Sequence, residues 1–310
     1  MSGITVLLAT WHGARFLDAQ LQSLHNQTGP PCSVLARDDG STDGTRAILD
    51  GWAERHPGWL KILPDDGTRR GASGSFGVLL AACPTPYAMM CDQDDHWHPD
   101  KIARSWALML ALERLHGSHV PLLIHGDARL IDENARALPG NLAAMLHHRL
   151  EDACRPARQV LHNYVTGCTL MLNRPLINLA IPIPEAAVWH DWWIGLLACV
   201  CGKVACIPGT VLDYRQHPAN VLGAGTMRWS ALFRRFPNPT AIRERMNRAS
   251  IQAAAVLARC HDRLGDRERA VLGTCAGLPH RNWLTRRTAL VSHGMWMPGM
   301  LRNVALMVFV

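Results

Sequence analysis

The chain has 310 residues, of which 48% are hydrophobic and 18% charged, and a formal net charge of +7. This composition excludes an intrinsically disordered protein, because the apolar side chains are numerous enough to bury a sizeable core. The length suggests one large domain, or one domain plus an appendage. Since no run of about 18 apolar residues and no secretory signal is present, we expect a cytoplasmic protein.

The first hundred residues alternate short apolar runs with amphipathic segments, which is typical of βαβ units and a parallel sheet. Leu17, Leu21 and Leu24, for example, recur at the spacing of one helix face. The expected strands are 4–9, 32–36, 60–63 and 87–91. The expected helices follow these strands, over 17–24, from about 45, over 71–83, and from Pro99 onward.

The middle of the chain continues the same pattern and predicts an α/β fold with a mostly parallel, Rossmann-like sheet. We expect strands at 121–126, 165–172 and 203–207, a helix at 190–200 and an extended segment at 211–217. Ten cysteines are scattered through apolar runs and predict no disulfide scaffold. The cysteines at 199, 201 and 206 lack the second ligand pair that a zinc site requires.

The last 90 residues are strongly basic. They carry 14 Arg and no Lys against four acids, a net charge of +10, which leaves −3 for the first 220 residues. Such a segment indicates contact with nucleic acid or with a phospholipid surface, and helices with solvated basic faces are the alternative. The final seven residues are apolar and can lie at a membrane interface or pack on the body.

Polar side chains follow the strands of the expected sheet. Because ligands of open α/β sheets bind outside the carboxyl ends of the strands, these residues should converge on one crevice: Thr10, Asp38, Asp39, Asp92 and Asp94. The run Asp92-Gln93-Asp94-Asp95 supplies hard oxygen ligands that suit Mg²⁺ or Mn²⁺, and such a cation would hold a diphosphate. Turn formation and helix capping are the alternative explanation.

Two common nucleotide-binding motifs are missing. The glycine-rich segment 71–74, preceded by Arg69 and Arg70, lacks the Gly-Lys-Ser/Thr of a P-loop. No Gly-x-Gly-x-x-Gly follows the first strand, so a nicotinamide-dependent dehydrogenase is not supported either. Arg70 remains a candidate contact for a diphosphate.

The motifs occur together in a recognisable order: Ile4 to Gly13, Asp38 to Thr45, Asp92 to Ile102, Thr166-Gly167-Cys168, His190-Asp191-Trp192-Trp193 and Tyr214-Arg215-Gln216-His217. Through these motifs, residues 4–222 resemble the family 2 glycosyltransferases. The similarity is greatest to bacterial members that build surface polysaccharides, including rhamnosyltransferase-like ones. One departure is Trp11-His12-Gly13, where the family often has Tyr-Asn-Gly.

The resemblance implies a GT-A fold over residues 1–222, followed by an arginine-rich, mainly helical region over 223–310. It also implies a nucleotide-diphosphate sugar donor and a Mg²⁺ or Mn²⁺ cofactor. Thr10 and Asp39 would then contact the nucleoside, with Asp39 accepting a hydrogen bond from the pyrimidine ring N–H. Asp94 would ligate the metal, and Asp92 would contact ribose or metal-bound water.

Further site residues follow from the same resemblance. Asp191 falls at the position of the catalytic base, and His217 at that of a further metal or diphosphate contact. Arg215 is a candidate diphosphate contact, because an arginine offers phosphate a two-pronged hydrogen bond. Trp192 is a candidate contact for the sugar or acceptor, although at least one of Trp192 and Trp193 should be core.

These features predict inverting, metal-dependent transfer of a sugar, from a UDP- or dTDP-sugar such as dTDP-rhamnose, to a glycan or lipid-linked acceptor. A bound cation stabilises charge on the leaving diphosphate, and a base accepts the proton of the attacking hydroxyl. Displacement in a single step inverts the anomeric centre. The alternatives are a sugar nucleotidyltransferase, a non-catalytic sugar-nucleotide or glycan-binding module and, least supported, a nucleic-acid binder. We also predict that the protein works at the inner face of the cell membrane, which the basic tail would contact.

Overall fold

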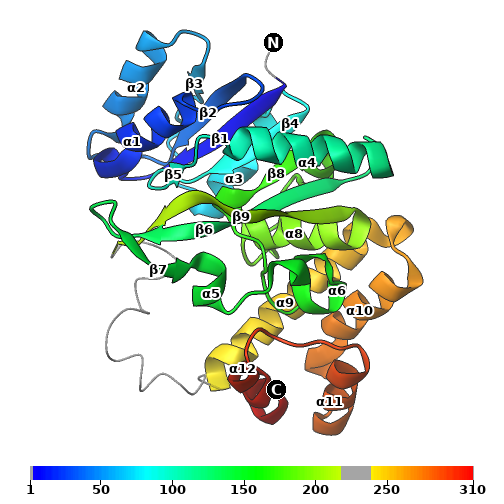
Figure 1. Cartoon of the computed structure of the whole chain (residues 1–310). Helices are drawn as coiled ribbons and strands as arrows, with labels where there is room; N and C mark the ends of the chain where they lie inside the picture. The colour runs from blue at the N-terminus through cyan, green and yellow to red at the C-terminus, as the bar shows by residue number, and fades with distance from the viewer. Residues whose placement is uncertain (1–2, 218–238, 310) are drawn as a thin grey trace.

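The computed structural model describes residues 3–217 and 239–309, which contain a nine-stranded mixed sheet (Figure 1). Its strands are β1 (Ile4–Thr10), β2 (Cys32–Asp38), β3 (Leu60–Ile62), β4 (Tyr87–Cys91), β5 (His96–Trp97), β6 (Leu122–Ile131), β7 (Ala137–Asn141), β8 (Met171–Asn173) and β9 (Lys203–Arg215). They lie in the order β3-β2-β1-β4-β8-β6-β9-β5, with β7 paired to β6. The α/β fold predicted from the sequence is confirmed.

The N-terminal half of the sheet is parallel, as the alternating pattern predicts. β1 pairs in parallel with β2 and β4, and β2 pairs in parallel with β3. β8 is antiparallel to both β4 and β6, and β6 and β9 are again parallel. The parallel strands β1, β2 and β4 therefore have their carboxyl ends at the same edge of the sheet.

The predicted strand at 165–172 is wrong over most of its length. Gly167–Thr169 form a 3₁₀ turn, and only Met171–Asn173 pair as β8. The segment is apolar because it is buried, and an apolar run does not distinguish a buried loop from a buried strand. β9 also differs, since the two short extended segments that we expected form one strand of 13 residues.

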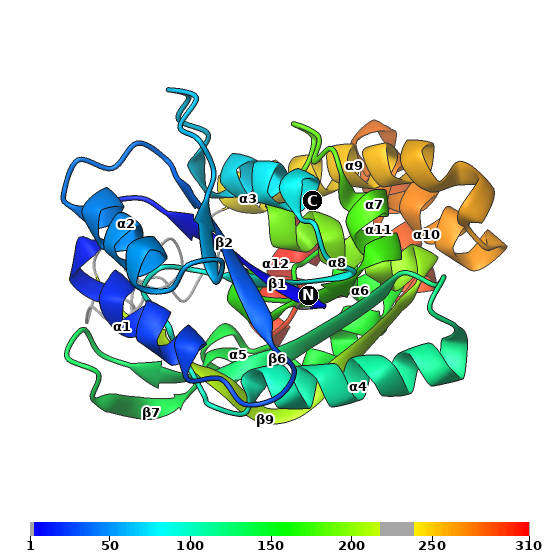
Figure 2. The same ribbon diagram turned by 90° about the horizontal axis from the view of Figure 1, so that it is seen from above.

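Helices cover both faces of the sheet (Figure 2). One face packs on α1 (Ala14–His25), α2 (Thr45–Arg55) and α4 (Lys101–His116), and the other on α3 (Gly71–Ala82), α7 (Arg174–Ala180) and α8 (His190–Cys201). Alternation along β1 creates this division, because Val6 and Leu8 face the first layer and Leu7 faces the second. The short helix α5 (Leu142–Leu146) contacts β6, and α6 (Pro156–Gln159) packs against α8.

The described part of the basic C-terminal region, residues 239–309, contains four α-helices: α9 (Pro239–Cys260), α10 (Asp266–Gly277), α11 (Trp283–Ser292) and α12 (Met300–Phe309). Their apolar side chains join the core of the α3 and α8 layer, so these helices pack on the body. The predicted boundary at 222/223 lies outside the described residues. Among the described residues, no helix is both long and apolar enough to cross a membrane.

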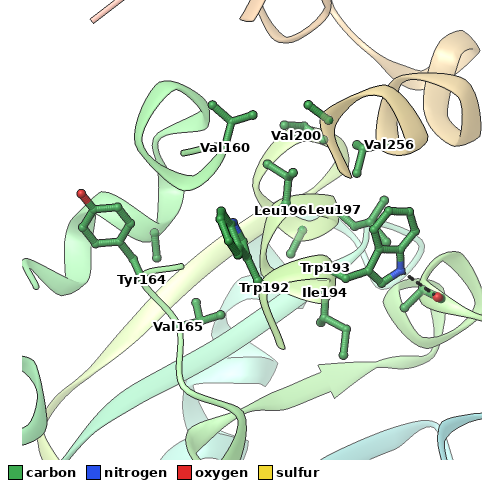
Figure 3. Close-up of a cluster of buried hydrophobic side chains, with 14 of the residues drawn as sticks. Val160, Tyr164, Val165, Trp192, Trp193, Ile194, Leu196, Leu197, Val200 and Val256 are labelled. Carbon is green, nitrogen blue, oxygen red and sulfur yellow. Dashed lines mark hydrogen bonds between the residues drawn. The ribbon is translucent and has the colours of Figure 1, made fainter. Parts of the chain in front are cut away.

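Trp193 lies at the centre of the core that α8 shares with the C-terminal helices (Figure 3). Its side chain is fully buried, and its indole N–H donates to the Ala180 carbonyl oxygen at 2.9 Å. We expect Trp193→Ala to lower the free energy of unfolding by about 3–5 kcal/mol, because it leaves a large cavity. Urea denaturation measures this change.

The matched control for this substitution is Trp283→Ala on α11, where the side chain is 65% exposed. It loses mainly the stacking of Arg287, whose guanidinium lies 3.8 Å from the ring centroid, so the expected loss is about 1 kcal/mol or less. Equal losses from both substitutions would show that the shared core does not stabilise the protein.

Candidate active site

A cavity of about 970 Å³ opens at the carboxyl ends of the parallel strands. Its wall includes Thr10 at the end of β1, Asp39 after β2, and Asp92 and Asp94 after β4. These four residues were expected to converge, and they do so because parallel strands end at the same sheet edge. Asp191 at the start of α8 also lines the cavity.

Asp38, which we expected in the same crevice, supports the loop behind it instead. Its carboxylate accepts hydrogen bonds from the hydroxyls of Thr10 at 2.8 Å and Ser41 at 2.6 Å, and from the Ser41 backbone N–H. Successive side chains of an extended segment point in opposite directions, so only one of the two neighbouring aspartates can face the cavity. That residue is Asp39.

Asp39 is buried against a charged partner. Its Oδ1 accepts hydrogen bonds from the Arg37 guanidinium and the Arg70 backbone N–H, and its Oδ2 accepts one from the Gly71 N–H. Burial by itself raises the pKa of Asp39, but these donors outweigh it and lower the pKa below its usual value. A carboxylate has about four acceptor sites, so ionised Asp39 retains capacity for one further donor.

Gln93 fixes the acidic loop onto the end of β1. Its amide accepts a hydrogen bond from the Trp11 backbone N–H at 2.7 Å and donates one to the Trp11 carbonyl oxygen at 2.9 Å. A Cβ on Gly13 would collide with the Gln93 side chain, so the close approach requires glycine there. The first and third motifs of the sequence are therefore joined by one amide side chain.

Asp94 and His217 are in contact, although 123 positions separate them in the sequence. Asp94 Oδ2 lies 2.7 Å from His217 Nε2, and both residues line the cavity. The structure thus brings together the two residues that the sequence assigned to a metal. A carboxylate oxygen and an imidazole nitrogen are donors that Mn²⁺ and Mg²⁺ sites use.

Arg215 holds this pair in place and does not contact the cavity as a candidate diphosphate ligand would. Its guanidinium donates to the backbone oxygen of Asp94 at 2.9 Å and to those of Asp132 and Glu133. It also stacks on the Phe16 ring at 4.7 Å from the centroid. A planar guanidinium group can donate to several carbonyl oxygens at once, and Arg215 uses its donors in this way.

The acidic loop concentrates several carboxylates in a buried place. Burial and the nearby charges of Asp94 and Asp191 raise the pKa of Asp92 to about 7. Asp92, Asp95 and Cys168 each bring one donor atom to within 4.8 Å of the others. Lys101 is the buried cation beside them, and burial lowers its pKa to about 8.

Asp191 lies in the first turn of α8, whose N-cap is Trp189, so Asp191 does not occupy the capping position. Its carboxylate accepts hydrogen bonds from the backbone N–H groups of Gly167 at 3.1 Å and Trp192 at 2.7 Å. A Cβ on Gly167 would approach His190 Nε2 to 3.0 Å, which explains the glycine in this motif. Two backbone donors therefore orient Asp191 in the cavity wall.

Two further candidate contacts are placed differently from the prediction. The Arg70 guanidinium pairs with Asp66 at 2.5 Å, four residues earlier in the same loop, and the neighbouring Arg69 lines the cavity instead. Trp192 is only 3% exposed, and its indole N–H donates to the Gln159 carbonyl oxygen. Its ring belongs mainly to the core, where it lies among buried apolar side chains (Figure 3).

Sequence reasoning missed several residues of the cavity wall. Trp11 is 43% exposed, and the Arg69 guanidinium stacks on it at 4.1 Å from the ring centroid. An exposed aromatic directly after the first strand is a signal that could have been used. Arg245 of α9 and Arg302 of α12 also line the cavity, and no local pattern indicates that.

Comparisons with known proteins identify the family of this chain. Residues 5–118 match the sequence profile of Glycosyl transferase family 2. The dTDP-rhamnosyl transferase RfbG of Shigella flexneri is 33% identical over 232 residues, which cover 70% of this chain and 74% of that protein. The chain belongs to glycosyl transferase family 2.

Other members of the family match over a similar span. An uncharacterized glycosyltransferase of Nostoc is 26% identical over 222 residues, which cover 70% of this chain and 66% of that protein. The chain thus spans slightly less than two thirds of this relative.

Solved structures show that this family 2 chain has the predicted GT-A fold. Staphylococcus aureus TarS 1–349 in complex with UDP-GlcNAc matches with a TM-score of 0.55 at 15% identity, over 94% of this chain and 79% of that one. The mannosyltransferase PcManGT of Pyrobaculum calidifontis, in complex with GDP-Man and Mn²⁺, matches with a TM-score of 0.54 at 19% identity, over 94% and 86%.

Proposed function

We propose that the protein transfers a sugar, with inversion and with the help of Mg²⁺ or Mn²⁺, from a nucleotide-diphosphate sugar to a glycan or lipid-linked acceptor of surface polysaccharide synthesis. One observation carries the proposal. The Asp94–His217 pair, Asp92 and Asp191 line a single cavity, at the sheet edge where α/β proteins bind their ligands. Membership of family 2 and the GT-A fold support the same activity.

The donor nucleotide would lie against the first two strands. Ionised Asp39 has capacity for the ring N–H of a pyrimidine, and Thr10 lines the same wall. Trp11, stacked on Arg69, offers an aromatic surface for the base. UDP- and dTDP-sugars carry that ring N–H, and RfbG is named as a dTDP-rhamnosyl transferase, so dTDP-rhamnose is the first donor to test.

The residues of the acidic loop fit a divalent cation. Asp92, Asp94 and His217 offer two carboxylates and one imidazole, and burial and the neighbouring carboxylates raise the pKa of Asp92, which a bound cation would relieve. When bound, the cation stabilises negative charge on the leaving diphosphate. The complex of PcManGT with GDP-Man and Mn²⁺ supports the choice of ion.

Asp191 would accept the proton of the attacking acceptor hydroxyl. The Gly167 and Trp192 N–H groups orient its carboxylate, which leaves further oxygen lone pairs for the substrate. A base that acts from the face opposite the leaving diphosphate produces single-step displacement and inversion.

Peripheral contact with a membrane through the C-terminal helices is also part of the proposal. Four side chains of α12 are apolar and exposed, and they would make this contact: Met300, Leu301, Val304 and Val308.

The experiment that tests this function is a melting-temperature panel with UDP-, dTDP- and GDP-sugars, each in Mn²⁺ and in EDTA. A ligand at about 100 times its dissociation constant adds about 2.7 kcal/mol to the free energy of unfolding, which corresponds to about 5 °C. We expect that shift with one pyrimidine nucleotide sugar, in Mn²⁺ but not in EDTA. If none of the donors shifts the melting temperature, the proposal is contradicted. A donor that shifts the melting temperature but is not turned over favours a binding module.

A further inference from the structure

The cavity has a second, basic wall that the donor site does not use. Arg245 and Arg248 of α9 and Arg302 of α12 contribute to it, together with His148 and His162. These arginines belong to the C-terminal region, which comes to the cavity from a different part of the fold than the strand ends (Figure 1). Part of the positive charge of the tail therefore faces the substrate cavity.

The guanidinium groups of this basic wall have neutral partners. Arg245 Nη1 lies 2.9 Å from His162 Nδ1, and Arg302 Nη1 donates to the Leu146 carbonyl oxygen at 3.3 Å. Within residues 3–217 and 239–309, no carboxylate forms an ion pair with either arginine. Glu244 also lines the cavity from α9, but it is exposed and pairs with neither of them.

A chain of hydrogen bonds orients Arg245. Arginine only donates, so His162 Nδ1 is an acceptor and a neutral His162 carries its proton on Nε2. That proton points to His148 Nε2, 2.8 Å away. Burial and the charge of Arg245 lower the pKa of His162 well below its usual value, and burial lowers that of His148 to about 4, so both rings are neutral at pH 7.

A buried donor adjoins the same cluster. The Tyr164 hydroxyl is fully buried and has no hydrogen-bond partner among the described residues. Its ring centroid lies 5.1 Å from that of His148 and 5.3 Å from that of His162. Tyr164 packs behind the two histidines and does not line the cavity, so the groups that an anion there would satisfy are the two arginines of like charge.

We infer that Arg245 and Arg302 bind a phosphate or diphosphate group of the acceptor, in the cavity that also holds Asp94 and Asp191. The inference rests on the proposed function and names the acceptor class. Arginine suits this ligand because its planar fork forms two parallel hydrogen bonds to phosphate oxygens. The donor diphosphate has its own site at the acidic loop, so the basic wall is available for the acceptor. A lipid diphosphate and a phosphate-bearing polysaccharide share this chemistry.

The test is a calorimetric titration of the full chain with inorganic pyrophosphate in EDTA, where the metal-dependent donor site does not compete. We expect the dissociation constant to rise about a hundredfold in the Arg245→Gln/Arg302→Gln double variant, because two charge-assisted contacts are lost. Arg281→Gln is the matched control, since Arg281 is an exposed tail arginine outside the cavity wall, and it should bind as the wild type does. Arg248→Gln provides a second variant should the double variant fold poorly, and we expect its affinity to fall about tenfold.

Three outcomes would overturn the inference. The first is equal affinity in wild type and in the arginine variants, and the second is no binding by the wild type at about 10 mM pyrophosphate. The third is a protein that binds phosphatidylglycerol vesicles, but not pyrophosphate, through Arg245 and Arg302, because the basic wall would then be a membrane surface. Loss of both pyrophosphate and phosphatidylglycerol binding in the double variant supports a phosphate site that a lipid headgroup can fill. Loss of pyrophosphate binding alone supports a soluble phosphate ester.

The same variants separate this inference from the proposed function. The melting-temperature shift with nucleotide sugar and Mn²⁺ reports on the donor site, and the pyrophosphate titration reports on the basic wall. If the wild type binds pyrophosphate through its arginines but shows no melting-temperature shift with a donor, the anion site is supported and the proposed function is contradicted. If the wild type shows the donor shift but does not bind pyrophosphate, the transferase is supported and a phosphate-bearing acceptor is contradicted.

Discussion

Replacement of Asp94 with asparagine should lower sugar transfer about a thousandfold and abolish the Mn²⁺ dependence of donor binding. Asp94 Oδ2 lies 2.7 Å from His217 Nε2, and the two residues face the cavity together. An asparagine keeps the size of the side chain and a neutral oxygen but loses the charge that a divalent cation requires. Transfer is measured as release of the nucleoside diphosphate, and donor binding as the melting-temperature shift in Mn²⁺ and in EDTA.

The control for Asp94→Asn is Asp50→Asn on α2, where the carboxylate forms an exposed ion pair with Arg46. It removes the same charge from the surface and should leave transfer unchanged, since exposed pairs contribute about 1 kcal/mol or less to stability. Near-normal turnover by Asp94→Asn, with metal dependence retained, would remove Asp94 from the proposed metal site.

Replacement of Asp191 with asparagine should lower the turnover number about a thousandfold and leave the donor-induced melting shift unchanged. The asparagine oxygen can still accept one of the two backbone hydrogen bonds, for example that from the Gly167 N–H, and the side chain keeps its size at the start of α8. What is lost is the basicity needed to take the proton of the attacking hydroxyl. Steady-state kinetics at saturating donor and acceptor, beside the melting assay, measure both quantities.

Asp266→Asn is the matched control, because Asp266 also lies in the first turn of a helix, α10, but is fully exposed. It should change neither turnover nor donor binding. An Asp191→Asn protein with near-normal turnover would assign the proton to another acceptor. Loss of donor binding together with turnover would instead make Asp191 part of the donor site, so the two assays separate a base from a ligand-binding residue.

Much of the fold could be predicted from local patterns. The first four strands and the helices between them follow from apolar runs and a period of 3.6, and their observed bounds differ little from the expected ones. Tertiary contacts decided the rest. β7 was not predicted because its residues are exposed or half-buried, and the buried turn at Gly167–Thr169 resembled a strand because burial alone made it apolar.

The acidic half of the candidate site was also predictable. Asp39, Asp92 and Asp94 follow strands whose parallel order places them at one edge, and the motifs near Asp191 and His217 completed the set. Side-chain direction was not predictable. Arg69 and Arg70 are neighbours, yet one lines the cavity and the other pairs with Asp66.

By itself, the sequence determined the alternating strands and helices of the N-terminal half, the family, and the acidic residues at the strand ends. These features depend on spacing along the chain, which a periodic pattern records directly. Only the tertiary structure decided that Arg215 serves backbone carbonyl oxygens, and that Arg245 and Arg302 turn into the cavity. Such roles depend on which distant elements pack together, because a long flexible side chain takes its direction from the partners that the folded chain brings within reach.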